Sequence, residues 1–345
     1  MRKFADIHVH LSEHNFKKAE SALDVCVSMG CEKIALQSLT YRSSAYNLWL
    51  LGLKDSYKRA ELSVFGMVHN EMSYSDVPFD IQARALVEMG CDGIKLMDAP
   101  CSRKRIGFGP NDPRYDKMLD YLEENEIPML IHVADPEEFW DDKDVTPYRR
   151  ERGWCYFEEG YLKKEELNEE IFEMLDKHPR LKVTLAHFFF LSNFIDEATR
   201  VMEKYPNVSF DVTPGWEMFL GFTANYDAAR EFFIKYRDRI YYGTDTNNTK
   251  RHNAEIHLLV RMALERDDEF MMPTYSERII RGLNLPEDVL NKIYYENYAR
   301  LIKKPKKVNM ELVNKYAEKM LSDIKDSEEE RDVRACEYLR EVLKK

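Results

Sequence analysis

The sequence predicts an α/β protein, a (β/α)8 TIM barrel with a C-terminal helical extension. Three observations lead to this fold class. Short runs of apolar or β-branched residues recur about every 30 residues, and there are eight of them. Stretches with helical periodicity separate most of these runs. Strand–helix alternation implies a parallel sheet, and eight such units are the number that closes a barrel.

The eight predicted strands are short, as strands of globular proteins are. In chain order they are Phe4–Val9, Ile34–Leu39, Leu62–Val68, Gly93–Met97, Pro128–Val133, Leu181–His187, Val208–Val212 and Ile240–Thr244. The clearest helical patterns between them are Lys17–Gly30, Ile81–Gly90, Arg114–Asn125, Glu165–His178, Asn193–Lys204 and Asp227–Tyr236. Glycines and prolines at several of these ends are typical helix stop signals. A doubly wound open sheet is the alternative, but no glycine-rich phosphate loop follows the first strand.

Two regions are expected along the chain, a barrel over residues 1–304 and a helical appendix over residues 305–345. The last barrel element is a predicted helix over Pro286–Ile302, and the basic segment KKPKK lies at the junction. Two apolar stripes predict two helices in the appendix: Met310, Val313, Ala317, Met320 and Ile324, then Val333, Cys336, Leu339 and Val342. Such stripes pack on the parent barrel or on a neighbouring subunit, so a homo-oligomer is an open expectation.

The composition is that of a folded, acidic protein. The chain has 345 residues with 51 Lys and Arg against 62 Asp and Glu, which gives a formal net charge of −11. A hydrophobic fraction of 44% with 33% charged residues excludes wholesale disorder. Nucleic acid and anionic membranes favour a basic surface, so we expect neither as a partner. A small-molecule substrate is compatible with the acidic balance, because it feels only the local field of its pocket.

The cysteines and the N-terminal region indicate a cytoplasmic protein. Six cysteines are scattered without a CxxC pair, which is typical of reduced thiols. The first predicted strand begins at Phe4, so no apolar core of a signal peptide precedes it. The longest apolar stretches are far shorter than the ~20 residues that a membrane span needs.

Ionisable side chains occur at or near the carboxyl ends of seven of the eight predicted strands. A charged or imidazole group cannot lie cheaply beneath the helices, so it must point into the barrel. In the first strand Asp6, His8 and His10 share one face. At the later strand ends the polar residues are His69, Lys95, His132, His187, Asp211, Thr213 and Asp245. The catalytic residues of barrel enzymes lie at this end.

His8 and His10 predict a metal site. Two histidines separated by one residue on a strand direct their imidazoles at the same point, and neutral imidazole is the commonest metal ligand. A third imidazole from the fifth strand, His132, and the eighth-strand carboxylate of Asp245 would complete the ligand set. This set suits one divalent ion, Zn²⁺ first, with Mn²⁺ or Fe²⁺ as alternatives. The competing interpretation is that these are core histidines with satisfied hydrogen bonds.

As a set, the motifs resemble the amidohydrolase superfamily. The resemblance lies in Asp6-Ile-His8-Val-His10, Leu130-Ile-His132, Leu185-Ala-His187 and Gly243-Thr-Asp245, and covers residues 1–304. Within the superfamily, the pattern is similar to the amidohydrolase-related branch, which includes the aminocarboxymuconate-semialdehyde decarboxylase-like enzymes. The resemblance implies that His8, His10, His132 and Asp245 hold one catalytic metal. It also implies that His187 faces the substrate.

These groups suit more than one reaction. A divalent ion with an open position lowers the pKa of a water molecule from ~15.7 towards ~7. Asp245 could accept the proton of that water, and His187 could polarise a substrate oxygen or move the proton. These groups suit hydrolysis and equally suit decarboxylation or hydration, so they do not fix the type of reaction. We expect a metal-dependent hydrolase of a small, carboxylated amide, ester or lactone. A lyase of the same fold, either a non-oxidative decarboxylase or a hydratase, is the first alternative. A catalytically silent barrel serving binding or assembly is the second, against which the intact ligand set argues.

Two residues of the predicted strands are candidate substrate contacts, Lys95 and His69. Lys95 either directs its positive charge at an anionic substrate or pairs with Asp211. In two-metal members of the superfamily a fourth-strand lysine is carboxylated and bridges the metals, so the resemblance leaves that role open as well. His69 is either a substrate contact or a polar residue of the rim.

Three further candidates for substrate binding lie on loops after the strands. Arg103 belongs to a basic cluster after the fourth strand, which as a charge run is also typical of a solvated face. Trp140 lies in the long segment Asp135–Lys164, which is rich in aromatic and arginine residues. That segment is either a lid over the site, which could clamp a carboxylate, or an exposed excursion. Trp216 follows the seventh strand and is expected to wall the pocket.

Overall fold

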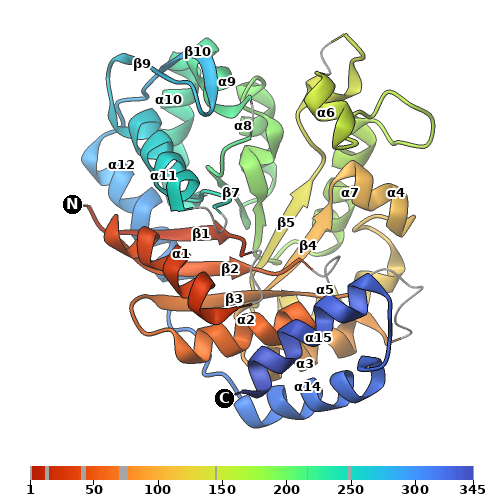
Figure 1. Cartoon of the computed structure of the whole chain (residues 1–345). Coiled ribbons are helices and arrows are strands. Elements are labelled where there is room, and N and C mark those ends of the chain that lie inside the picture. Colours follow the sequence, from red (N-terminus) through yellow and green to blue (C-terminus); the bar gives the residue numbers. More distant parts are fainter. Residues whose placement is uncertain are drawn as a thin grey trace.

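A computed structural model gives the arrangement of the chain (Figure 1). It describes residues 2–11, 15–39, 44–69, 77–143, 146–215, 217–246 and 250–344. In these ranges no helix combines the length and the apolar character that crossing a lipid bilayer requires. Eight parallel strands form a barrel, with helices around it and two further helices at the C-terminus. The predicted fold class is therefore confirmed.

The strands follow one another around the barrel in chain order, and each pairs in parallel with the next. They are β1 (Phe4–Val9), β2 (Cys31–Gln37), β3 (Glu61–Met67), β4 (Gly93–Asp98), β5 (Met129–Val133), β6 (Val183–Leu185), β7 (Val208–Asp211) and β8 (Ile240–Tyr241). All eight lie on the predicted runs, and their ends differ from the prediction by at most three residues.

The barrel closes where the residues after β8 meet β1. The backbone N–H of Ile7 donates to the carbonyl of Tyr242 at 3.0 Å, and that of Asp245 donates to the carbonyl of His8 at 2.8 Å. The N–H of His10 then donates to the carbonyl of Thr246 at 3.0 Å. These bonds bring Asp245 beside the two histidines of β1.

Helices cover the outside of the barrel in the order that the sequence predicts. The principal ones are α1 (Phe16–Ser28), α2 (Ala45–Ser56), α3 (Phe79–Met89), α5 (Pro113–Glu124), α7 (Lys164–Lys177), α8 (Ile195–Lys204), α10 (Tyr226–Lys235) and α11 (Lys250–Glu265). The six helices that periodicity predicted between the strands all form, with each end within two residues of its expected position. Gly30 and Gly90 have φ of 100° and 117° just after α1 and α3, the left-handed conformation expected at helix ends.

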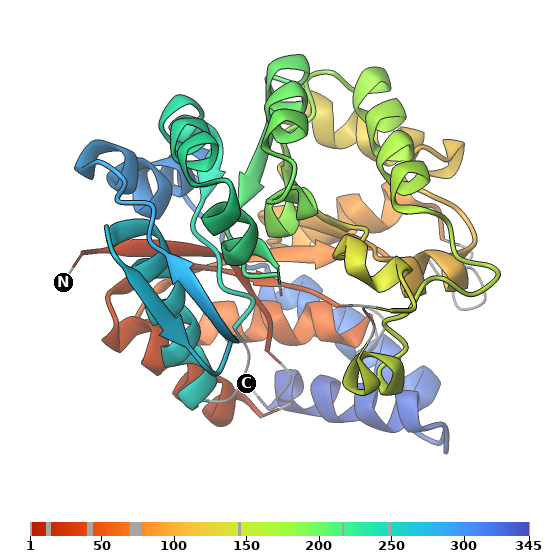
Figure 2. The ribbon, with the colours of Figure 1, turned by 90° about the horizontal axis from the view of Figure 1, so that it is seen from above.

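Shorter elements lie between the strands and the principal helices. They are α4 (Pro100–Ile106), η1 (Glu137–Trp140), α6 (Pro147–Glu151), η2 (Ala186–Phe190), α9 (Met218–Ala224), η3 (Arg237–Arg239) and the hairpin of β9 (Glu269–Met272) and β10 (Ser276–Arg281). The hairpin packs on α9. The segment with α6 extends outside the ring of strands in both views (Figures 1 and 2).

The end of the barrel opposite the mouth is closed by one long helical segment. This segment consists of α12 (Glu287–Asn291), a π-helical turn η4 (Lys292–Glu296) and α13 (Asn297–Leu301), and it occupies the predicted helix over Pro286–Ile302. Tyr298 and Ile302 pack there with inward side chains of the strands, among them Ala5, Phe65 and Leu130. The interior of the barrel at the end where the strands begin is therefore a packed core.

Both helices of the appendix form and pack on α2. They are α14 (Met310–Ile324) and α15 (Glu330–Leu343), drawn in blue beside α2 and α3 (Figure 1). Tyr338 of α15 contacts the rings of Tyr46 and Trp49, which are buried in α2. The second predicted stripe is buried except for Val333, which is 48% exposed.

The chain leaves β6 through a left-handed turn that replaces the predicted end of that strand. His187, Phe188, Phe189 and Phe190 all have φ between 50° and 56°. Each such residue costs roughly 1–2 kcal/mol when it carries a side chain, so tertiary contacts must hold the turn. Phe188 packs among buried phenylalanine rings, and the carbonyl of Phe190 accepts a hydrogen bond from Lys164 Nζ at 3.0 Å. His187 is therefore presented by a turn after the strand.

Candidate metal centre

His8 and His10 direct unprotonated nitrogens at the same point. His8 Nδ1 lies 2.9 Å from Asp211 Oδ2, and His10 Nδ1 lies 3.0 Å from the backbone carbonyl of Gln37. Both neighbours are acceptors only, so each Nδ1 carries the proton and each Nε2 keeps a lone pair. The two Nε2 atoms are 3.1 Å apart, and burial lowers the pKa of His8 well below its ordinary value. Two neutral imidazoles arranged in this way favour a shared cation.

Asp245 adds a carboxylate to the pair. Its Oδ1 lies 3.5 Å from His10 Nε2, and partial desolvation raises its pKa to about 6 although the Lys95 ammonium lowers it. One ligand atom from each of His8, His10 and Asp245 lies within 4.8 Å of the others, and no other group in the described ranges gathers in this way. Two imidazoles and a carboxylate fit a divalent ion of the Zn²⁺, Mn²⁺ or Fe²⁺ type.

Asp211 at the end of β7 orients the site from behind. It is fully buried, and burial raises the pKa of its carboxyl. One oxygen faces His8 Nδ1, while the other accepts the backbone N–H groups of His187 at 2.8 Å and Thr213 at 3.1 Å. Such partners fix the tautomer and the ring orientation of a ligating histidine. Sequence reasoning placed Asp211 at the mouth without this role, although a carboxylate at a strand end facing HxH is a usable signal for it.

Lys95 lies beside His8. It is fully buried, and its Nζ is 3.5 Å from His8 Nε2. Burial lowers the pKa of Lys95 to about 8, whereas the carboxylates of Asp211 and Asp245 raise it. Lys95 does not line the cavity described below, and its predicted roles at the substrate or as a carboxylated ligand stay predictions.

His132 and His187 form a second pair of imidazoles. His187 Nδ1 faces the carbonyl of Thr213 at 3.3 Å, so its Nε2 is the acceptor and faces His132 Nδ1 at 3.0 Å. His132 Nε2 faces the carbonyl of Ala134 at 3.1 Å and Asp135 Oδ1 at 3.4 Å. Both ring nitrogens of His132 therefore lie within hydrogen-bonding distance of a partner in this arrangement. The predicted fourth ligand is therefore next to the group of three but outside it.

A cavity opens at the carboxyl ends of the strands, in two adjoining parts of 640 and 140 Å³. Both parts are lined by His132, His187 and Asp245 together with Asp135 and Trp154. The larger part also contacts His10, Met97, Cys101, Ser102, Arg105, Arg152 and Tyr156, and the smaller contacts Pro136, Phe139, Phe190 and Pro214. The imidazoles and the carboxylate therefore face a space of small-molecule size.

The comparison with protein families decides the assignment. A family model described as Amidohydrolase matches residues 58–304, which is most of the barrel and includes His132, His187 and Asp245. The chain belongs to the amidohydrolase family. Members of this superfamily generally bind divalent metals, and the cluster of His8, His10 and Asp245 is the corresponding candidate site in this amidohydrolase. A search of curated protein sequences found no match.

Solved structures share the fold of this amidohydrolase at low sequence identity. An uncharacterized TIM-barrel protein from Bordetella bronchiseptica has a TM-score of 0.53 and 14% identity, over 88% of this chain and 99% of its own. A protein from Staphylococcus aureus provisionally described as an amidohydrolase has 0.58 and 12%, over 88% and 100%. The apo form of IDCase from Metarhizium anisopliae has 0.53 and 11%, over 87% and 97%. At these identities the likeness concerns the fold alone.

Three of the remaining predicted substrate contacts of the amidohydrolase, Arg103, Trp140 and His69, are not among the residues that line the cavity. Arg103 donates to Glu170 Oε1 at 2.5 Å and faces α7. Trp140 donates from Nε1 to the carbonyl of Leu162 at 2.9 Å. His69 follows β3, where its backbone N–H donates to Gln82 Oε1 at 2.7 Å. Trp216 lies outside the described residues.

The sequence predicts the segments that line the cavity, but other residues of these segments form the lining. Arg105 lines the cavity in place of Arg103, two positions away on the same short helix. In the segment after β5, Arg152 and Trp154 line the cavity in place of Trp140. The Arg152 guanidinium lies 4.5 Å from the centre of the Tyr148 ring and 5.4 Å from that of Trp154. This part of the predicted lid therefore lies against the mouth.

Proposed function

We propose that the protein is a metal-dependent hydrolase that acts on a small, carboxylated amide, ester or lactone. The observation that carries the proposal is the convergence of two imidazole lone pairs and one carboxylate at the mouth of an amidohydrolase-family barrel. A silent barrel would have no need to keep both histidines in the same metal-binding tautomer. This argues against the binding or assembly alternative.

His8, His10 and Asp245 are proposed as the ligands, and His132 as a fourth ligand that joins them if its ring gives up one of its two present hydrogen bonds. We propose Zn²⁺ as the ion, with Mn²⁺ and Fe²⁺ as alternatives, because imidazole with one carboxylate suits all three. A divalent ion at this place supplies a Lewis acid for a substrate oxygen and lowers the pKa of a water molecule.

Asp245 and His187 are the proposed catalytic residues. A carboxyl group with a pKa of about 6 is largely ionised at neutral pH, so Asp245 can accept a proton and return it. Burial lowers the pKa of His187 well below its ordinary value, so this ring is neutral. A substrate oxygen that replaces His187 as the partner of His132 Nδ1 would receive a hydrogen bond there, and His187 Nε2 would be free to take up a proton.

The substrate is proposed to be a small anion on the basis of the cavity lining. Arg105 and Arg152 are the cations that line the larger part of the cavity, and a guanidinium binds a carboxylate through two parallel hydrogen bonds. Trp154, between the two parts, offers a flat apolar face for the rest of the molecule. Substrate contacts of Lys95, His69, Arg103, Trp140 and Trp216 remain predictions that the same kinetic assays can test.

Metal analysis tests the proposal directly. We expect about one divalent ion per chain in the purified protein, and its loss in the His8→Ala/His10→Ala double variant. The matched control is His187→Asn, which should retain the ion and lose turnover, because His187 is proposed to act on the substrate. A wild-type protein that neither contains nor takes up Zn²⁺ or Mn²⁺ would refute the proposal and favour the silent barrel. Loss of the ion in His187→Asn would make His187 a ligand.

The type of reaction is tested by product analysis. A panel of lactones, amides and aromatic acids is incubated with the metal-loaded protein, and both hydrolysis products and CO₂ are measured. Hydrolysis that depends on His187 supports the proposal. Release of CO₂ or addition of water to a double bond, without hydrolysis, would overturn it in favour of the lyase.

We further propose that the protein acts in a reducing compartment such as the cytoplasm. All six cysteines are unpaired, as expected where thiols stay reduced. A homo-oligomer remains a prediction, which the mass of the protein in solution would test.

A further inference from the structure

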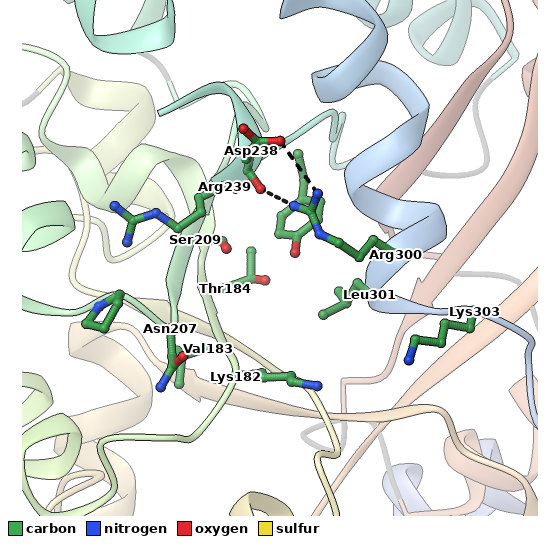
Figure 3. Close-up of a pocket in the computed structure, with 12 residues that line it drawn as sticks. Lys182, Val183, Thr184, Asn207, Ser209, Asp238, Arg239, Arg300, Leu301 and Lys303 are labelled. Atoms are coloured by element: carbon green, nitrogen blue, oxygen red, sulfur yellow. Dashed lines mark hydrogen bonds and ion pairs between the residues drawn. The ribbon is translucent and has the colours of Figure 1, made fainter. Parts of the chain in front are cut away.

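A second cavity lies at the other end of the barrel, where β6, β7 and β8 begin. It has a volume of 340 Å³ and lies between the starts of these strands and the end of α13. Figure 3 shows the hydroxyl groups of Thr184 and Ser209 in the middle of this space, with the basic side chains Lys182, Arg239, Arg300 and Lys303 around them. A neighbouring hollow of 250 Å³ shares three of these cations, Lys182, Arg300 and Lys303.

The charge of this cavity is opposite to that of the protein. Four cations and a single carboxylate, that of Asp238, line it, whereas the whole chain has a net charge of −11. Asp238 is already neutralised on its other side, because Lys292 Nζ lies 3.1 Å from its Oδ1 and Arg300 Nη1 lies 3.6 Å from the same atom. The KKPKK segment that begins at Lys303 adds further positive charge at the rim. The local field therefore attracts a small anion although the protein as a whole repels it.

A hydroxyl donor remains available on the floor of the cavity. Thr184 of β6 and Ser209 of β7 lie side by side in the register of the two strands, and the two residues are only 3% and 8% exposed. Within the described part of the chain, the Thr184 hydroxyl has no hydrogen-bond partner and Lys303 forms no ion pair. Many inward positions at this end of the barrel are filled by apolar and aromatic side chains such as Ala5, Phe65 and Leu130. The Ser209 hydroxyl interacts with that of Tyr241, so the Thr184 hydroxyl is the group that points to a polar occupant.

We propose that this cavity binds the phosphate group of a small molecule. A phosphate presents oxygen acceptors in several directions, which matches the Thr184 hydroxyl below it and ammonium and guanidinium groups at its sides. Arg239 contributes charge more than hydrogen bonds, because it already donates to the carbonyls of Met202, Tyr205 and Val208. Lys182 is already paired with Glu126, whose Oε2 lies 2.9 Å from its Nζ, so Lys303 and the outer face of Arg300 remain to contact the anion. The site is independent of the metal centre, since the strand ends that form it are opposite to those that hold His10 and Asp245.

Phosphate titration of the full-length protein tests the proposal. Binding of inorganic phosphate is measured by calorimetry and by the shift in Tm, at constant ionic strength with chloride as the balancing anion. We expect saturable binding to the wild-type protein and at least ten-fold weaker binding by Lys303→Glu and by Thr184→Val. The matched control is Lys319→Glu, which makes the same charge change at an exposed position of α14. Glucose 6-phosphate serves as a second probe, and tighter binding of this ester than of free phosphate identifies a phosphorylated metabolite as the occupant.

The outcomes separate a built site from general electrostatics. No saturable binding of either probe to the wild-type protein overturns the proposal, and so does an equal loss of affinity in Lys303→Glu and Lys319→Glu. Thr184 is buried, so its variant could be destabilised, but Lys303 is exposed and its variant keeps the test decisive. Because metal content and turnover are measured on the same samples, failure of this site and failure of the metal centre are seen separately. We expect both to be unchanged in Lys303→Glu.

Discussion

Replacing Asp211 by Asn should weaken metal binding without removing any proposed ligand. Asp211 Oδ2 faces His8 Nδ1 at 2.9 Å, and this contact places the imidazole proton on Nδ1. The two backbone N–H groups on Oδ1 will keep the asparagine carbonyl in that place, so the amide NH₂ must face His8. A donor that faces Nδ1 stabilises the other tautomer, in which Nε2 carries the proton and can no longer bind an ion.

The size of the effect follows from this reversal of one hydrogen bond behind a ligand. Changes of the partner behind a metal-binding histidine typically weaken metal affinity about 10- to 100-fold. This corresponds to about 1.4–2.7 kcal/mol of binding free energy. Lys95 Nζ lies 3.5 Å from His8 Nε2 and also competes with an ion for that nitrogen. We therefore expect a loss of metal affinity within this range.

The assay is competition for Zn²⁺ between the protein and a chromophoric chelator, with circular dichroism to establish that the variant is folded. The matched control is Asp6→Asn. Asp6 is a buried carboxylate on β1, and its Oδ2 lies 4.0 Å from His257 Nε2, beyond hydrogen-bonding distance. Asp6 accepts the backbone N–H of His8 at 3.0 Å and the hydroxyl of Thr244 at 2.5 Å, and this hydroxyl can reverse its hydrogen bond. An Asp211→Asn protein whose Zn²⁺ affinity matches that of the wild type and of the control would refute the reasoning.

Three further predictions concern stability and substrate binding. Lys54→Met should lower the free energy of unfolding by about 3 kcal/mol, because it leaves the buried carboxylate of Asp92 without its cation. Lys204→Met, which breaks an exposed ion pair, should lower it by less than about 1 kcal/mol. Urea titrations of both variants compare the two losses. Burial lowers the pKa of His257 to about 3, so the unfolded chain takes up a proton first as the pH falls. The stability of the wild type relative to His257→Phe should therefore fall by about 2 kcal/mol from pH 7 to pH 5, and a difference that stays constant with pH would contradict this. Arg152→Ala should raise KM for a carboxylated substrate at least ten-fold with little change in kcat, whereas Arg150→Ala on the same segment should leave KM unchanged.

Much of the fold could be predicted because barrel strands and amphipathic helices have distinct periodicities. The helix α2 was missed for a physical reason. It is buried on every side, between the barrel and the appendix, so its sequence AYNLWLLGLKDS has no polar face that would show a helical period. The early end of β6 was missed because a left-handed turn is normally marked by glycine, whereas this turn is built from His187 and three phenylalanines.

The residues of the site likewise fall into those that the sequence could predict and those that it could not. His8 and His10 could be predicted because alternate residues on a strand share a face, and Asp245 because it follows the last strand. The donor and acceptor pattern around His132 could not, since it depends on the carbonyl of Ala134 and on a turn that the sequence does not reveal. Arg103 and Arg105 are separated by two positions on a helix and therefore point to different sides. The sequence identifies the cluster but does not decide which arginine lines the cavity.

The hydrogen bonds that join the residues after β8 to β1 have a consequence for how the protein would acquire the proposed ion. The histidines are made near the start of synthesis, while the carboxylate emerges more than two hundred residues later. Until the hydrogen bonds between these two segments form, the nascent chain exposes two imidazoles that bind a cation only weakly. Retention of the proposed ion should therefore show that the barrel has closed. A variant that breaks the hydrogen bonds between β1 and the residues after β8 would lose the ion before it loses its helices.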